Sequence, residues 1–419
     1  MEEEKRTKRL SGILGIALLL IAAVLLAART GKVKNLVAMA KGPEQYTSYV
    51  VMRQLRTWNE TVCSGYEAKL DNYEEHGKLY HSREITVDAS ARALLKTYLD
   101  VVGKSTELNG VLTLTENADS FRIDGSLQYG EEDYPVTYET TEENFSVNML
   151  CASGALDHKQ LKKMLEEYET FVLEEIIKCF TKEGSQSTLS LLKEKTAHEA
   201  GGITAMERVI TVHLTKEDNV VVMQTLFDRI LADEQLREVY EAGSLTGKSY
   251  ESSVEDLRTQ LLSIAEATKI QIFVTDKGSI SGVCIKHPEG MWELGFDCVA
   301  NKTGIGIRAQ VVQESKNIFE AEGTFLMSDG MFQGTLQGQV SVEEELQKFT
   351  LQLSDVSVMG VVHGRMLGEV QLLLTDGPLE DVGASVSLNA SDEYQELLLS
   401  VIYGGADQLL IELTLRDAD

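Results

Sequence analysis

Hydrophobic and polar residues follow two different periods along the chain, and the change falls near residue 268. From Lys269 onward they alternate by twos, as in "KIQIFVTDKGSISGVCIK" (269–286), with turn sequences such as Asp-Lys-Gly and Pro-Glu-Gly between the runs. This spacing predicts about ten or eleven short strands joined by hairpins. An antiparallel meander of that length closes, curls or covers its edges with helices, so we expect a curved, half-barrel-like sheet.

Before residue 268, apolar residues recur mostly at three- and four-residue steps, which is typical of amphipathic helices. Residues 31–75 predict helix with a break at Gly42-Pro43, and Pro43 is expected to open the second segment. The aromatic-rich stripe of that segment, from Tyr46 to Tyr73, predicts a core face rather than a ligand platform. Further helices are expected over 90–102, from Asp157 to Phe180, and over 217–241 and 251–266, with strands over 79–87, 187–194 and 205–214 and alternating runs within 105–150.

The patterns together predict an α+β protein: an N-terminal transmembrane helix, followed by amphipathic helices packed on a long curved antiparallel β-meander. We divide the chain into five segments on this basis. They are a cytoplasmic tail (1–9), a transmembrane anchor (10–28), juxtamembrane helices with a first strand (29–103), a mixed region (104–267) and the meander (268–419).

The transmembrane prediction rests on the stretch from Leu10 to Ala28, which contains 19 residues without a charge and has basic residues on both sides. As a helix it would span about 28 Å, close to the hydrocarbon thickness of a bilayer. A cleaved secretory signal has a shorter apolar region, and the small-x-small sequence Ala38-Met39-Ala40 lies too far downstream for cleavage. We therefore expect an uncleaved single span. The basic residues crowded before it favour a cytoplasmic N-terminus, with the bulk of the chain extracytoplasmic.

Composition and net charge limit the kinds of binding partner that we expect. Hydrophobic residues make up 43% of the 419 residues and charged residues 25%, which is typical of a globular protein. The formal net charge is −27. An acidic surface repels phosphate backbones, so nucleic acid is excluded as an expected partner.

One stretch, "AGSLTGKS" (242–249), satisfies a relaxed phosphate-loop pattern. That chemistry needs a buried strand before the loop, whereas the charged helical run "DRILADEQLREVYE" (228–241) precedes it here. We interpret Gly243 as a helix terminator and the rest as a turn, so no nucleotide partner is expected. Ser190 and Lys193 fit Ser-x-x-Lys, but the companion motifs of acyl transfer are absent from the sequence.

Metal and thiol chemistry receive no stronger signal. His76 and His81, with Glu74 and Glu75, form the only local histidine cluster, and its position indicates a helix-to-strand turn. "HEAGG" (198–202) lacks the second histidine of a zinc protease. The five cysteines show no CxxC spacing and predict incidental buried thiols. The sequence thus predicts no catalytic, cofactor-binding or metal-binding residue and no cofactor.

"GPEQYTSYVVMRQL" (42–55) resembles a recurring junction in uncharacterised single-pass membrane proteins of Gram-positive bacteria. There, a Ser-Pro-Glu-x-Tyr-x-x-Tyr-Val-like stretch leads into a helix of the extracytoplasmic part, and glycine replaces the serine at 42. "VTDKGSISGVCI" (274–285) is similar to a strand–Asp-x-Gly–strand unit of the same group. The resemblance implies a location at the cell membrane and carries no catalytic residues.

Three hypotheses of function follow from these patterns. The first is a non-enzymatic, membrane-tethered extracytoplasmic protein that binds or scaffolds a component of the cell envelope. The second is a binder or carrier of a lipid or other apolar ligand in a curved-sheet cavity; a dry cavity lined by strand side chains would support it, and a filled, well-packed concave face would contradict it. The third is an enzyme with an unrecognised site, which would require converging titratable groups in a pocket.

Overall fold

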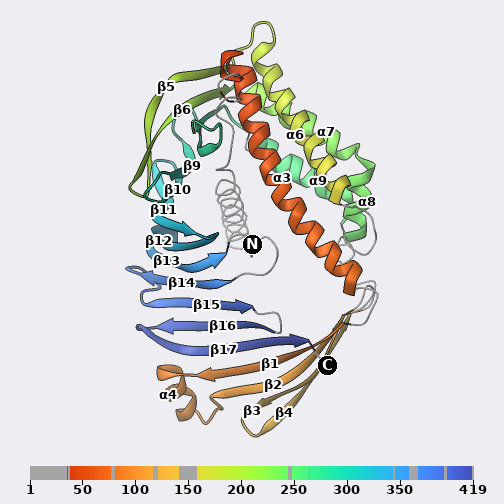
Figure 1. Ribbon diagram of the computed structural model, residues 1–419, viewed down its shortest axis with the longest axis vertical. Coiled ribbons are helices and arrows are strands. Elements are labelled where there is room, and N and C mark those ends of the chain that lie inside the picture. Colours follow the sequence, from red (N-terminus) through yellow and green to blue (C-terminus); the bar gives the residue numbers. More distant parts are fainter. Residues whose placement is uncertain are drawn as a thin grey trace.

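The computed structural model describes residues 35, 38–76, 81–116, 121–140, 158–243, 248–263, 265–342, 345–357, 367–390 and 394–417 (Figure 1). The predicted anchor over 10–28 lies outside them. No helix that is described has the length and apolar character needed to cross a bilayer.

Most helices begin and end close to where the sequence predicts them, but the stretch 217–241, predicted as helix, is divided into two helices, Lys216–Leu231 and Glu234–Gly243. Pro43 opens the longest one, and the Thr47 hydroxyl donates to the Pro43 carbonyl at 2.8 Å in its first turn. Thr215 caps α7 by accepting a 3.2 Å hydrogen bond from the Asp218 amide. The described helices are α3 (Pro43–His76), α4 (Ala93–Val101), α6 (His158–Thr181), α7 (Lys216–Leu231), α8 (Glu234–Gly243) and α9 (Tyr250–Ser263).

All described strands belong to one antiparallel sheet of 17 strands. They are β1 (His81–Ala91), β2 (Glu107–Glu116), β3 (Phe121–Tyr129), β4 (Glu132–Thr140), β5 (Thr188–Ala200), β6 (Ile203–Leu214), β7 (Thr268–Val274), β8 (Ile280–Lys286), β9 (Trp292–Ala300), β10 (Ile305–Gln313), β11 (Lys316–Ser328), β12 (Met331–Val342), β13 (Glu345–Ser357), β14 (Gly368–Thr375), β15 (Val382–Ala390), β16 (Tyr394–Tyr403) and β17 (Ala406–Asp417). The eleven strands from β7 to β17 confirm the predicted meander.

The sheet is open and runs from β5 through β17 to β1 and on to β4. Neighbouring strands are consecutive in the chain except β17 and β1, where Ile411 lies opposite Ala89. Strands from the predicted juxtamembrane, mixed and meander segments therefore share a single sheet. In the described part of the chain, β5 and β4 are its edges.

The main core lies between one face of β5–β8 and the helices α3 and α6, at the end of the molecule where α3 begins (Figure 1). Tyr46 and Val50 of α3 are fully buried there against Ile210, Val212 and Ile272. This confirms that the upstream part of the aromatic stripe is a core face. We call the side of the sheet that carries these three strand residues the inner face.

The β5–β6 hairpin bends back over the opposite, outer side of β9 and β10. The pairing register shifts between Leu192 and Thr196, and this irregularity redirects the ribbon. Beyond it, Ala200 at the hairpin tip lies directly on Gly306 of β10, so close that a Cβ atom at 306 would collide with the Ala200 carbonyl. The glycine therefore permits the close approach of two backbones.

Gly306→Ala should lower the free energy of unfolding by at least about 2 kcal/mol, because the added methyl group overpacks a backbone contact. Gly295→Ala on neighbouring β9 is the matched control, since its Cβ would meet only the flexible Gln310 side chain at 3.0 Å. We expect the control to change the unfolding free energy by less than about 1 kcal/mol in chemical denaturation. Equal effects of the two substitutions would contradict this account of the hairpin.

Candidate functional site

The inner face is aliphatic along rows that cross many strands. Directly opposed residues of antiparallel strands point to the same side of a sheet, so the register identifies each row. One row runs across six strands, and all of its residues are aliphatic. At a spacing of about 4.8 Å between neighbouring strands, the row is about 24 Å long. It consists of Leu353, Val370, Val386, Leu399, Ile411 and Ala89.

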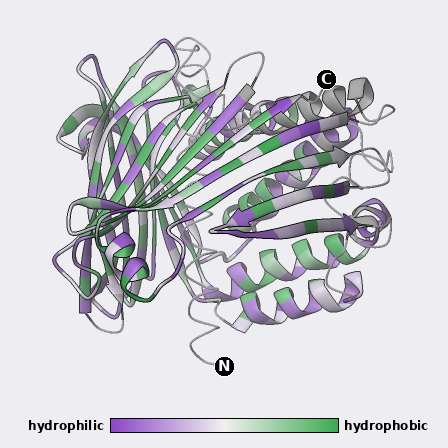
Figure 2. Cartoon of the chain, turned by 90° about the horizontal axis from the view of Figure 1, so that it is seen from below, coloured by the Kyte–Doolittle hydropathy of each residue, from purple (hydrophilic) through white to green (hydrophobic). Residues whose placement is uncertain are grey.

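The neighbouring rows have the same character, and the outer face does not. A second row contains Leu351, Leu372, Ala384, Val401, Leu409 and Ala91. On the outer face of the same strands, Ser354 lies opposite Glu369 and Glu369 opposite Ser387. This alternation is visible along the strands in Figure 2. We call the inner-facing residues of β13–β17 and β1 the open inner face.

Burial divides the inner face into two halves. At the helix-covered end the aliphatic positions are buried, with Ile210 at 0% and Ile307 at 5% exposure. On the open inner face, Val370, Val386 and Leu399 are only partly buried and Leu372 is 37% exposed, whereas Ala89 and Ala91, which end the two rows on β1, are buried. Among the described helices, α3 packs on β5 and β8, away from these strands. The aliphatic rows therefore continue from the buried core onto strands where most of their side chains are partly accessible to solvent.

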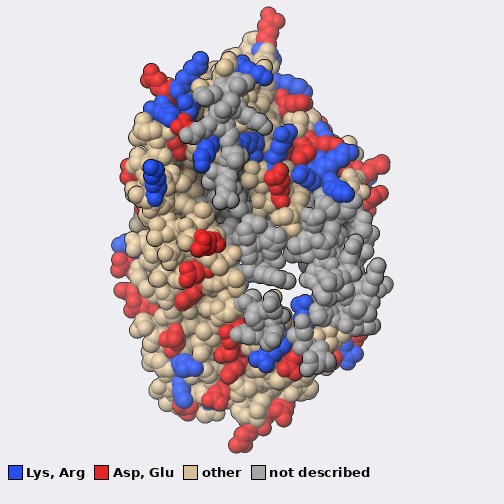
Figure 3. Space-filling model, viewed as in Figure 1, with Lys and Arg blue, Asp and Glu red and all other residues tan. Residues whose placement is uncertain are grey.

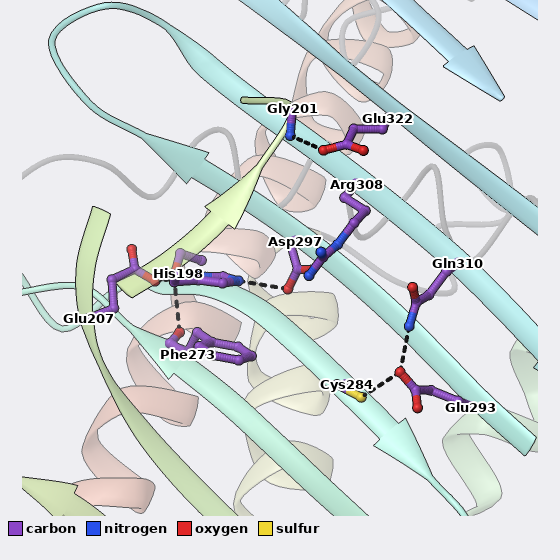
Figure 4. A network of polar contacts seen from close by, with 11 residues as sticks. His198, Gly201, Glu207, Phe273, Cys284, Glu293, Asp297, Arg308, Gln310 and Glu322 are labelled. Carbon is purple, nitrogen blue, oxygen red and sulfur yellow. Dashed lines mark hydrogen bonds and ion pairs between the residues drawn. The ribbon is translucent and has the colours of Figure 1, made fainter. Parts of the chain in front are cut away.

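A second candidate site is a buried polar network on the outer face, where the β5–β6 hairpin covers β8–β10 (Figure 4). His198 of β5 bonds through Nδ1 to Glu207 Oε2 at 2.6 Å and through Nε2 to Asp297 Oδ1 at 2.9 Å. Arg308 of β10 donates from Nε and Nη2 to Asp297 Oδ2 at 3.0 and 2.7 Å. The Ser281 hydroxyl donates to Glu207.

The arrangement is suited to holding the hairpin in place rather than to nucleophilic chemistry. A serine hydrolase needs the imidazole beside the hydroxyl, whereas the Ser281 hydroxyl bonds a carboxylate here. The imidazole is instead stacked on the Phe273 ring, with centroids 3.8 Å apart. Two carboxylates, one imidazolium and one guanidinium compensate each other in charge, so the buried network is neutral when His198 is protonated.

The motifs considered in the sequence are dispersed in the structure. The described part of α8 extends to Gly243, and Lys248 pairs with Asp256 at 3.0 Å. Residues 244–247, the centre of the phosphate-loop-like stretch, lie outside the described residues. Ser190 and Lys193 lie within β5.

The described residues do not form a metal site or a reactive thiol at the positions considered in the sequence. His76 ends α3 and His81 begins β1, and their side chains are outside the described part. No group of three or more metal-ligating side chains occurs within the described ranges. Burial raises the pKa of the Cys284 thiol to about 11, which disfavours the reactive thiolate.

Sequence reasoning missed the His198 network, although two of its residue pairs could have been inferred from the sequence. The tight turn after Ala200 places His198 and Glu207 near each other on β5 and β6, and the turn between β9 and β10 places Asp297 directly opposite Arg308. Each pair follows from local hairpin register. The stacking of one hairpin on the other leaves no local signal.

Comparison with known proteins adds no relative, since neither a protein-family model nor a curated protein matches the sequence.

His198 should make the stability of the fold depend on pH. Burial alone would lower the pKa of its imidazole, but the hydrogen bonds to Asp297 and Glu207 outweigh burial and raise that pKa above its usual value. A raised folded-state pKa contributes stability fully below the unfolded value of about 6.5 and loses it as pH rises through the folded value. We expect the urea-unfolding free energy to fall over that alkaline interval.

His198→Gln removes the titrating group and keeps hydrogen-bonding capacity. The variant should be less stable than the wild type at pH 6 and should lack the decline above about pH 6.5. An unchanged pH profile in this variant would show that His198 does not carry the dependence.

Proposed function

We propose that this chain is a membrane-tethered, non-enzymatic protein that binds the acyl chain of a lipid along the open inner face. The observation that carries the proposal is the contrast in burial along continuous rows. Ile305 and Phe325 are buried, while Val386 and Leu399, farther along the same row, remain partly exposed. An extended aliphatic surface that no described helix covers favours an apolar ligand over the more general scaffolding role.

The dimensions and energetics suit one acyl chain. A bilayer core of about 30 Å is two acyl chains deep, so a row of about 24 Å is long enough to accommodate one chain. Each buried methylene contributes about 0.8 kcal/mol, so ten of them supply about 8 kcal/mol before the cost of immobilising the lipid. The residues of the row offer no hydrogen-bonding or charged side chain, so recognition is by shape and apolar contact.

The proposed location is the cell membrane, with a single span over 10–28 and the bulk of the chain extracytoplasmic. Asn35 donates from Nδ2 to the Asp276 carbonyl at 3.0 Å, which pins the start of the described chain to the β7–β8 turn. Lys195 and Arg208 pair with Asp276 at this turn, and basic and acidic side chains are interspersed at this end of the molecule (Figure 3). Basic residues next to a span suit an anionic bilayer surface.

Leu399→Glu tests the proposal by placing a charge in the middle of the aliphatic row. The full chain is extracted from membranes in mild detergent, and bound lipid is quantified by mass spectrometry. We expect near-stoichiometric lipid with the wild type and at least about a tenfold loss with Leu399→Glu, because a carboxylate cannot be buried against an acyl chain.

Leu398→Glu is the matched control, because it is the adjacent residue of β16 and lies on the outer face opposite Glu412 and Ser387. It should retain the lipid, and thermal unfolding of both variants establishes that they fold. Lipid retained by Leu399→Glu would overturn the proposed site. A wild-type chain that yields no lipid would overturn the proposed function.

A further inference from the structure

Helix α4 carries an apolar face that points away from the protein. Leu94, Tyr98 and Val101 follow each other at steps of four and three residues, so they share one side of the helix. Their exposed fractions are 62%, 63% and 80%, and Val102 beside them is 46% exposed. None of the residues of α4 is buried. Large side chains this exposed on one helical face mark a surface that contacts something else.

This exposure is built into the fold. The buried amide of Gln408, at the β16–β17 turn, accepts the Leu95 amide hydrogen at its Oε1 at 3.1 Å. The Gln408 carbonyl accepts from the Arg92 amide at 2.8 Å. Gln408 itself is held because its Nε2 donates to the carbonyls of Tyr403 and Ala406, both at 3.1 Å. The helix is thus fixed on β17, with Leu95 and Leu99 as its least exposed residues.

The stretch that contains α4 has a net charge of the opposite sign to that of the whole chain. Between residues 92 and 104 there are three basic residues, Arg92, Lys96 and Lys104, and one acidic residue, Asp100, which gives a net charge of +2. All four are exposed. The chain as a whole carries −27. A short amphipathic helix with leucine, tyrosine and valine on one side and basic residues beside them is complementary to an anionic lipid surface.

The position of α4 determines which part of the molecule a contact with an anionic lipid surface would restrain. It lies at one end of the longest axis of the molecule, and the start of α3 lies at the other (Figure 1). Six residues separate Ala28 from Asn35, a reach of about 20 Å, so a span over 10–28 leaves the bilayer near the β7–β8 turn. A single tether there leaves the far end of the sheet free to swing.

We propose that α4 seats the far end of the molecule on the same anionic bilayer that holds the N-terminal span. The two attachments then lay the long axis, and with it the open inner face, along the membrane surface. This inference rests on the membrane attachment in the proposed function, but it depends on different residues from the acyl-chain site.

Tyr98→Trp in the full chain, reconstituted into vesicles, is the test. The vesicles contain phosphatidylcholine with phosphatidylglycerol, and a bromine-labelled phosphatidylcholine quenches tryptophans that enter the bilayer. Relative to the parent chain with Trp58 and Trp292, we expect loss of most of the added emission. Leu257→Trp, at an exposed apolar position of α9, should not be quenched.

Two further variants separate the apolar from the charged contribution. Adding Leu94→Ser and Val101→Ser to Tyr98→Trp should abolish the quenching, because the inserted face is lost. Adding Lys96→Glu and Lys104→Glu should abolish it as well, and omitting phosphatidylglycerol should have the same effect.

The possible outcomes distinguish this inference from the proposed function. A chain that washes off vesicles at alkaline pH would refute the membrane tether. A chain that stays bound without quenching at 98 would refute the role of α4 alone and would indicate a protein partner for this face. Aggregation of vesicles in place of quenching would assign α4 to a second bilayer and overturn the inference. The lipid occupancy of Leu399 variants is independent of all three results.

Discussion

The architecture depends on one constraint: the strands of the sheet must place most of their apolar side chains on the same face. Antiparallel neighbours share a face in register, and a shift by one residue would turn an entire strand over. The rows that pass through Ile210 at one end and Leu399 at the other obey this rule. A sheet this long then has more apolar surface than the described helices can cover, and that surplus is the candidate binding surface.

The helix-covered end is held by a different device, in which two hairpins stack back to back. Gly306 removes the side chain that would keep Ala200 away, and the charges of His198, Glu207, Asp297 and Arg308 balance inside the contact. Burying His198, Glu207 and Asp297 is costly unless each is paired, and the partly exposed Arg308 supplies the second positive charge, so the network requires the hairpin to sit in one position. This fixes the curvature where α3 and α6 pack and leaves the other half of the sheet open.

Local patterns predicted much of this fold, and long-range pairing limited the rest. Period-two alternation after Lys269 and the proline at 43 identify the meander and α3, because both are properties of neighbouring residues. Ile411 pairs with Ala89 across more than 300 positions, and no local signal specifies that partner. The open inner face was missed for the same reason, since its rows exist only once β17 and β1 are adjacent. Pro135 did offer a clue, because proline suits an edge strand such as β4.

An uncovered aliphatic face is a liability for a free protein, because it promotes association between copies. Tethering to a bilayer changes which contact this face makes. In a chain held at a membrane, the face can contact acyl chains, which are present at high local concentration, in place of water or a second copy. The net charge of −27 works in the same direction, since it opposes contact between copies and discourages pairing at the β4 edge. The locally basic, apolar α4 departs from that charge where contact with an anionic lipid surface would be favourable. Charge and hydrophobicity therefore favour membrane lipid as the partner both at the open inner face and at α4.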